Sequence, residues 1–314
     1  MSKQTLIAVA AGLASAVVFA LVLTGAPAAV MVAYFAQLPV LLIGLSLGLG
    51  HGLIAAGSAL VAVMIAGGGV ATAGLYFVVH ALPTVGIVRQ SLLCKTGEGQ
   101  RTIWYPPGPL LAGLTGYAAA MFLLAVTFFS GRDGGLMGVL TPVIEAQLNQ
   151  LVPTMEAAKR ENLISLWRAI FPGTVASSWL VMVVINGVLA QHLLVKSGKN
   201  LRPTPTYMDL AVAKWLTVAI AIAAVTWLVG GETFSYVGQT LTIVFGFPFV
   251  LQGLAVVHTV FKSFSWHGFA LLAFYAIFLF TGWLVLLVAI LGFVEPWSKI
   301  RDRIRPAQLG KEKE

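Results

Sequence analysis

The sequence predicts an all-α fold, a polytopic bundle of transmembrane helices, and three observations support this prediction. Of the 314 residues, 59% are hydrophobic and 10% are charged, whereas a soluble domain carries about 25% charged residues. No Asp, Glu, Lys or Arg occurs from Gln4 to Val88. The run FALLAFYAIFLFTGWLVLLVAILGF, residues 269–293, lacks the polar alternation of a barrel strand. Because backbone groups in lipid must be paired internally, helices are the remaining solution.

Nine apolar segments are expected to cross the bilayer, within an estimate of about 8–10 spans. They lie at roughly 5–24, 29–48, 51–66, 70–90, 108–130, 173–195, 210–229, 236–261 and 268–294. The second contains Pro39 and the fourth Pro83, which membrane helices tolerate when neighbours satisfy the freed carbonyls. At about 1.5 Å per residue, the region 263–296 is over-long for one perpendicular span. This region is expected to be either a hairpin of two short helices or one strongly tilted helix.

The net charge of +8 is distributed in a way that indicates a membrane rather than nucleic acid. The basic residues lie in short loops and in the final segment KIRDRIRPAQLGKEKE, as in cytoplasmic loops of bacterial inner-membrane proteins. We therefore expect both termini in the cytoplasm, which requires an even number of spans.

One long connection, residues 131–172, interrupts the membrane pattern. Thr141-Pro142 predicts an N-cap followed by Pro at the first helical position. Beyond it, apolar residues recur at three- and four-residue spacing from Leu140 to Met155, with polar residues between them. Amphipathic helices are expected here, either at the membrane interface or over the bundle as a lid. The chain thus divides into 1–130, 131–172, 173–296 and a basic tail, 297–314.

Tests for catalytic, metal and cofactor motifs give no support for an enzyme. The sequence has no P-loop and no H-E-x-x-H, and its single cysteine, Cys94, excludes an internal disulfide and a Cys-based zinc site. Residues 44–48 match G-x-S-x-G, but a nucleophile elbow requires a strand-to-helix turn. Gly44, Gly48 and Gly52 instead predict a ridge for close helix packing. No catalytic residue, metal site or cofactor is expected.

Polar side chains within spans are costly in lipid and are therefore candidates for function. The deepest are Asn186, Gln252 and His80, the last lying three residues before Pro83. If all three converge on one cavity, a ligand site is indicated. If each pairs separately with a neighbouring helix, their role is structural.

Two resemblances cover most of the chain. YFAQLPVLLIGLSLGLGHGLIAAGSALVAVMIA, residues 34–66, resembles the early helices of the substrate-binding S-components of energy-coupling-factor transporters. FGFPFVLQGLAVVHTVFK (245–262), ALPTVGIVRQSL (81–92) and LWRAIFPG (166–173) resemble the YybS-like family of predicted bacterial membrane proteins. That family is grouped with the S-component-like membrane folds.

The resemblance implies a protein that binds or transports a small solute without an ATPase of its own. In S-components the first helix presents small residues to an energising transmembrane partner, and Ala8, Gly12 and Ala16 keep that spacing here. This chain departs from the six-span pattern because it has two or more additional spans after residue 209. The alternative is a non-enzymatic scaffold or regulator of envelope machinery. Expected partners are the lipid bilayer and either an energising module or other membrane proteins, but no nucleic acid.

Overall fold

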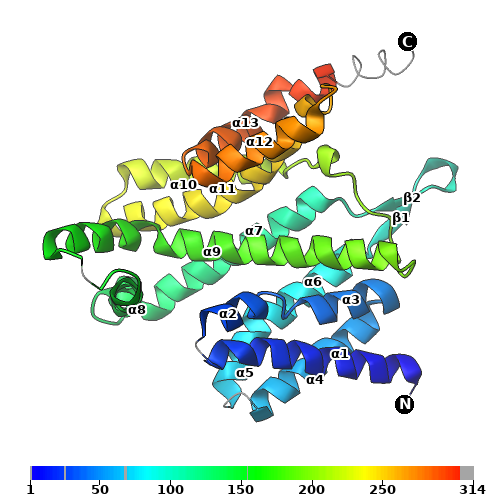
Figure 1. Cartoon of the computed structure of the whole chain (residues 1–314), viewed down its shortest axis with the longest axis horizontal. Helices are drawn as coiled ribbons and strands as arrows, with labels where there is room; N and C mark the ends of the chain where they lie inside the picture. Colours follow the sequence, from blue (N-terminus) through cyan, green and yellow to red (C-terminus); the bar gives the residue numbers. More distant parts are fainter. Residues whose placement is uncertain (1, 25, 67–68, 154, 305–314) are drawn as a thin grey trace. The chain divides into compact units, whose positions relative to one another are not determined.

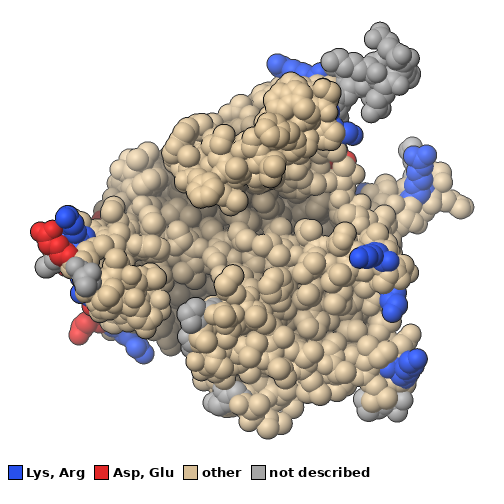
Figure 2. Space-filling view, in the orientation of Figure 1, with Lys and Arg blue, Asp and Glu red and all other residues tan. Residues whose placement is uncertain are grey.

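The computed structural model describes residues 2–24, 26–66, 69–153 and 155–304, and these residues form an all-α bundle (Figure 1). The predicted fold class is confirmed. The chain divides into two compact units: unit 1 comprises Met1–Leu110 and Val181–Pro205, and unit 2 comprises Leu111–Leu180 and Thr206–Glu314. Wide areas of the face in Figure 2 carry no Lys, Arg, Asp or Glu, as a lipid-exposed surface requires.

Unit 1 is built from short helices that are broken at defined points. Its elements are α1 (Lys3–Ala20), a 3₁₀ turn (Leu21–Thr24), α2 (Pro27–Ala33), α3 (Leu38–Leu47), α4 (Leu49–Ala66), α5 (Val70–Tyr76), a π-helical turn (Phe77–Ala81), α6 (Leu82–Ser91), a hairpin of β1 (Cys94–Thr96) and β2 (Thr102–Trp104) around a 3₁₀ turn (Glu98–Gln100), and the end of α9.

The small residues of α1 allow a close contact with α4. A Cβ placed on Gly12 would lie 2.2 Å from the carbonyl oxygen of Ala55, so only glycine fits there. Ala8 and Ala16, one turn to either side of Gly12, are buried in the same core cluster. The stripe that the resemblance assigned to an energising partner is therefore occupied by α4 of the same chain.

The glycines of α3 and α4 have different roles. Gly44 packs against Val88, and a Cβ on Gly52 would lie 3.1 Å from the Cα of Gly44. Gly48 has no atom within 4 Å of its Cβ position but has a φ of +93°, and it ends α3 immediately before α4 begins. Gly44 and Gly52 thus allow close packing, whereas Gly48 allows the change of chain direction.

Unit 2 contains longer helices. They are α7 (Pro107–Phe129, whose first turn belongs to unit 1), α8 (Gly135–Leu151), most of α9 (Ala157–Lys196), a 3₁₀ turn (Tyr207–Asp209), α10 (Lys214–Val229), α11 (Glu232–Phe261), α12 (His267–Phe280) and α13 (Leu284–Ser298).

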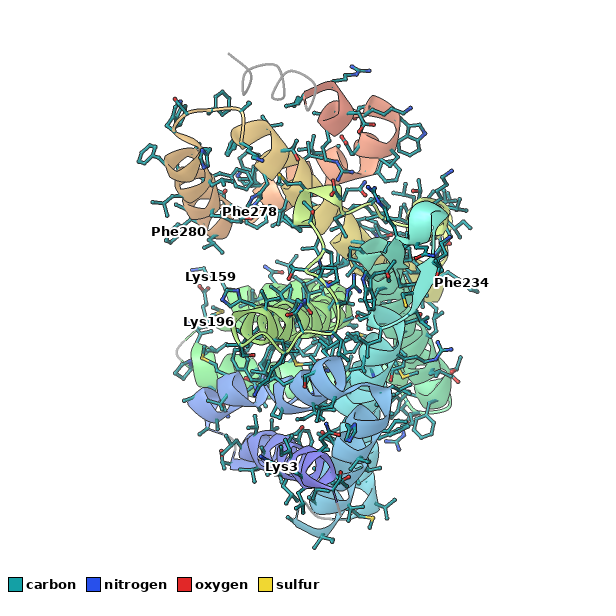
Figure 3. All side chains as sticks on the ribbon, turned by 90° about the vertical axis from the view of Figure 1, so that its right-hand side faces the viewer. Lys3, Lys159, Lys196, Phe234, Phe278 and Phe280 are labelled. Atoms are coloured by element: carbon teal, nitrogen blue, oxygen red, sulfur yellow. The ribbon has the colours of Figure 1, made fainter. Side chains whose placement is uncertain are left out.

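The 131–172 connection is helical, but its start was predicted wrongly. α8 begins at Gly135, after Gly134 in a left-handed conformation, and Pro142 lies inside the helix. The apolar residues Ile144 and Leu148 of α8 pack against Ile164 of α9. α9 then continues without interruption through Pro172 into the sixth predicted span. Lys159 and Lys196, labelled in Figure 3, belong to its first and last turns.

α11 and α13 cross at two glycines. A Cβ on Gly253 would lie 1.9 Å from the oxygen of Val288, and one on Gly292 would lie 1.9 Å from the oxygen of Phe249. Neither position accepts a side chain unless the helix backbones separate.

Each of the nine predicted segments coincides with a described helix or helix pair. Seven of these are long and apolar enough to cross a membrane, and the pair α12 and α13, bent by 118°, raises the number to eight. α10 is also apolar but shorter. The bend shows that the over-long region 263–296 is a pair of short helices. At the end of α12 the side chain of Phe280 is 90% exposed (Figure 3), which is favourable in contact with lipid.

Candidate functional site

Unit 1 contains a set of buried polar side chains around a break in the second span. Residues 34–37 form a turn between α2 and α3, in which the oxygens of Phe35 and Gln37 accept from backbone N–H groups and those of Tyr34 and Ala36 accept from side chains. The amide of Asn186 donates to the oxygen of Tyr34 at 2.7 Å, and the Ser15 hydroxyl donates to the oxygen of Ala36. Side chains from α1 and α9 therefore satisfy this turn.

The fourth span is interrupted next to the same turn. Pro83 has no N–H, so the oxygen of Val79, four residues earlier, loses its helical donor. The Gln37 amide donates to that oxygen at 3.1 Å. The turn Phe77–Ala81 is π-helical, a distortion frequent at functional sites.

Three rings connect these two interruptions to α1. Tyr76 and His80 stack with centroids 5.5 Å apart, and Phe19 meets both rings edge-on at 5.2 and 5.4 Å. The Tyr76 hydroxyl is 2.7 Å from that of Ser15. Thr84 follows His80 by four residues, so the two side chains leave the same face of the helix. We refer to Ser15, Gln37, Tyr76, His80, Thr84 and Asn186 as the polar cluster.

Four atoms of the polar cluster have no hydrogen-bond partner among the described residues, although all four are buried. They are Gln37 Oε1, His80 Nδ1, Thr84 Oγ1 and Asn186 Oδ1. Two are amide oxygens, which only accept hydrogen bonds. The cluster therefore presents mainly acceptors to the interior of unit 1.

Gln252, the third residue proposed from the sequence, belongs to unit 2, and both polar atoms of its side chain have hydrogen-bond partners. Its Oε1 accepts from the backbone N–H of Val212 at 2.6 Å, and its Nε2 donates to the oxygen of Gly292 at 2.6 Å. Pro296 removes the helical donor of that oxygen. The predicted site residues thus fall into two groups: Asn186 and His80 in the polar cluster, and Gln252 on backbone partners in unit 2.

Sequence reasoning missed four members of the polar cluster, Ser15, Gln37, Tyr76 and Thr84. Two of them carry a recognisable signal. Gln37 lies two residues before Pro39, and Ser15 is a polar residue within the otherwise apolar run between Gly12 and Ala16. Tyr76 and Thr84 have no comparable signal, because their role depends on partners in other helices.

Unit 2 also contains buried hydroxyls without a partner among the described residues, those of Ser177, Tyr236, Thr240 and Ser298. They are a weaker candidate site because the first three lie in uninterrupted stretches of α9 and α11, and Ser298 is the last residue of α13. Like the hydroxyl of Thr84, these hydroxyls can rotate toward a backbone carbonyl, whereas the amide oxygens of Gln37 and Asn186 in the polar cluster cannot become donors.

A buried cation lies outside the spans, in the segment that follows α9. Arg202 donates to the oxygens of Ser91 and Tyr105 at 3.0 and 3.4 Å, and its guanidinium lies over the Trp104 ring. Burial lowers the pKa of Arg202. Since Ser91 is the last residue of α6, the positive charge stabilises the end of that helix. The described residues include no group of three or more His, Cys, Asp or Glu side chains that could hold a metal ion.

In the comparison with protein-family models, the family described as "Predicted membrane protein (DUF2232)" matches residues 13–295. A search of curated protein sequences found no significant match. A search of solved structures found none.

Proposed function

The chain belongs to this family of predicted membrane proteins, DUF2232, and we propose that it binds a small solute inside unit 1, at the polar cluster, as part of a transport function. The observation that carries the proposal is the set of four buried, unpartnered polar atoms. A buried polar atom without a partner costs roughly 1–3 kcal/mol, and native proteins contain few of them. A bound molecule that donates hydrogen bonds would remove this cost.

The place of the cluster in the fold supports the proposal. Transporters commonly bind solutes where membrane helices are discontinuous, because unwound segments expose backbone groups. Here the turn at 34–37 and the π-helical turn at Phe77–Ala81 interrupt two spans and are joined by the Gln37–Val79 hydrogen bond. The sequence carries no P-loop, so transport would depend on an energising partner or on an ion gradient. The stripe of Ala8, Gly12 and Ala16 is not available to such a partner, because it packs on α4.

We further propose that the end of unit 1 bearing the N-terminus faces the cytoplasm of a bacterial inner membrane. Gly12 packs near Ala55, and Ala20 shares a recess with Ala66, so α1 and α4 run parallel and begin at the same end. Leu201 bonds to Leu45 near the start of α4, which places the segment after α9 there too. The sequence of unit 1 carries its Lys and Arg residues at this end, namely Lys3, Arg89, Lys95, Arg101, Lys196, Lys199 and Arg202.

The C-terminal end of α13 is proposed to face the same compartment. Arg301 forms an ion pair with Glu295 at 2.9 Å and donates to the oxygens of Met208 and Leu210. These residues follow the basic segment after α9 and precede Lys214, so the positive-inside rule applies to them as well.

The exposed Cys94 is the single cysteine of the chain and tests this orientation without any substitution. In intact cells a membrane-impermeant maleimide should leave Cys94 unlabelled, and permeabilisation should make it reactive. Labelling in intact cells would reverse the proposed orientation.

Thr84→Val tests the site with the least disturbance of the fold. Valine has nearly the same shape, and the hydroxyl that it removes has no partner, so stability should be unchanged or slightly higher. Native mass spectrometry of the purified full chain should show a retained small molecule that Thr84→Val loses.

Thr240→Val is the matched control, because Thr240 is an equally buried threonine without a partner, but in unit 2. It should retain the molecule. Loss of the molecule in Thr240→Val alone would move the site to the hydroxyls of unit 2. Retention in both variants would refute a site at the polar cluster.

A further inference from the structure

An apolar recess of about 310 Å³ opens between α1 and α4 of unit 1. None of the side chains that line it is polar: they are Leu13, Ala16, Val17, Phe19 and Ala20 of α1, Leu23 of the following 3₁₀ turn, and Ala62, Val63 and Ala66 of α4. The helices touch at Gly12, and beyond that contact the small residues Ala16, Ala20, Ala62 and Ala66 leave the space between them unfilled. Its volume is at the lower end of the range for small-molecule sites.

Phe19 connects this recess to the polar cluster. Its ring lines the recess and also contacts Tyr76 and His80 edge-on. Ser15, which bonds to Tyr76, is adjacent in sequence to Ala16 of the lining. A molecule lying in the recess therefore has the side chain of Phe19 between it and the ring of His80, whose Nδ1 is one of the unpartnered atoms.

The two regions select opposite chemistry at the two ends of a ligand. The recess offers only apolar contacts, so a polar group placed there would lose its hydrogen bonds to water without replacement. The cluster offers the amide oxygens of Gln37 and Asn186, which require a donor. The helices of the cluster contain no carboxylate to neutralise a cation, because Glu98 of the hairpin is the single acidic residue in the sequence of unit 1. An anion would meet mainly acceptors.

We propose that the solute is an amphiphile, with an apolar chain in the recess and an uncharged, hydrogen-bond-donating head such as an amide or an alcohol at the polar cluster. This inference rests on the proposed function and specifies its substrate class. Entry from the lipid phase follows from the geometry, since Leu13, Val17 and Leu23 of the lining are exposed on the apolar surface.

The test uses the full chain in phosphatidylcholine nanodiscs and three uncharged probes. Dodecanamide has the tail and a donor head, methyl dodecanoate has a tail of the same length without a donor, and acetamide has the head alone. Dodecanamide should raise the melting temperature saturably. At least tenfold more methyl dodecanoate should be needed for the same rise, and acetamide should have no effect at equal concentration.

Variants separate specific binding from partition into the bilayer. Ala62→Phe fills the recess, and Thr84→Val removes one acceptor of the head, so each should weaken the dodecanamide effect at least tenfold. Ile65→Phe adds the same ring to α4 at a position that is exposed and outside the recess, and it should respond like the wild type.

An equal response of Ala62→Phe and Ile65→Phe, or an equal effect of dodecanamide and methyl dodecanoate, would overturn the amphiphile inference. Stabilisation by acetamide that Thr84→Val abolishes would also overturn it, while supporting a polar solute at the cluster. Failure of the proposed function itself has a different signature, because native mass spectrometry would then show the same retained mass in Thr84→Val as in the wild type, or none in either.

Discussion

Two glutamines, one in each unit, donate to a carbonyl oxygen that lies four residues before a proline, but their own side-chain oxygens differ in whether they have a partner. Gln37 donates its amide to the oxygen of Val79, four residues before Pro83, and Gln252 donates to the oxygen of Gly292, four residues before Pro296. In each case a helix proline removes a donor and a buried side chain replaces it. The oxygen of Gln252 also accepts from Val212, whereas the oxygen of Gln37 has no partner among the described residues.

The difference shows that burial of a polar residue in a membrane helix does not by itself indicate function. Both glutamines are 1% exposed. Their functional meaning depends on whether the surrounding structure uses all of their hydrogen-bonding groups. Both polar atoms of the Gln252 side chain have partners in unit 2, whereas the amide oxygens of Gln37 and Asn186 in unit 1 have none among the described residues.

The largest effect is expected for Gln252→Leu. Two backbone groups lose their partner, the partly buried N–H of Val212 and the buried oxygen of Gly292, and an unpaired buried group costs roughly 1–3 kcal/mol. We expect a loss of about 3 kcal/mol in unfolding free energy, measured by titration with sodium dodecyl sulfate in mixed micelles, without loss of the retained molecule. Loss of that molecule at unchanged stability would reverse the assignment of Gln252.

The Pro296→Ala substitution should recover part of that loss. Alanine supplies a backbone N–H for the oxygen of Gly292, so this oxygen no longer needs Gln252. The double variant Gln252→Leu with Pro296→Ala should be about 1 kcal/mol more stable than the sum of the single effects predicts. A double-mutant cycle measures this coupling, and strict additivity would show that the proline does not create the demand for the amide.

Of the two glutamine substitutions, Gln37→Leu should change stability less and ligand binding more clearly. The oxygen of Val79 is the one backbone group that loses a side-chain donor, so about 1 kcal/mol should be lost. The retained molecule should disappear, because Oε1 of Gln37 is one of the acceptors proposed for it. Equal stability losses for Gln37→Leu and Gln252→Leu, with the molecule retained in both, would remove the distinction between the units.

Part of the candidate site could be predicted from the sequence. Asn186 and His80 were recognisable because a polar side chain within an apolar run is costly, whatever the fold. Gln252 met the same criterion, yet its partners Val212 and Gly292 lie 40 residues away in either direction. Asn186 bonds to Tyr34 across 152 residues. Such pairings depend on helix packing, which the pattern of one helix does not specify.

The sequence by itself determined where the helices lie, because lipid leaves the backbone few alternatives and the apolar runs are long enough to mark each span. It did not predict the breaks, because Pro39 and Pro83 were expected inside continuous spans and the glycines of residues 44–52 were expected to form a packing ridge. Only the tertiary structure decided that Gly48 turns the chain while Gly12 admits α4, and which freed carbonyl each amide reaches. The physical reason is that helix formation in lipid is a local backbone requirement, whereas the satisfaction of a buried polar atom depends on atoms from distant parts of the chain.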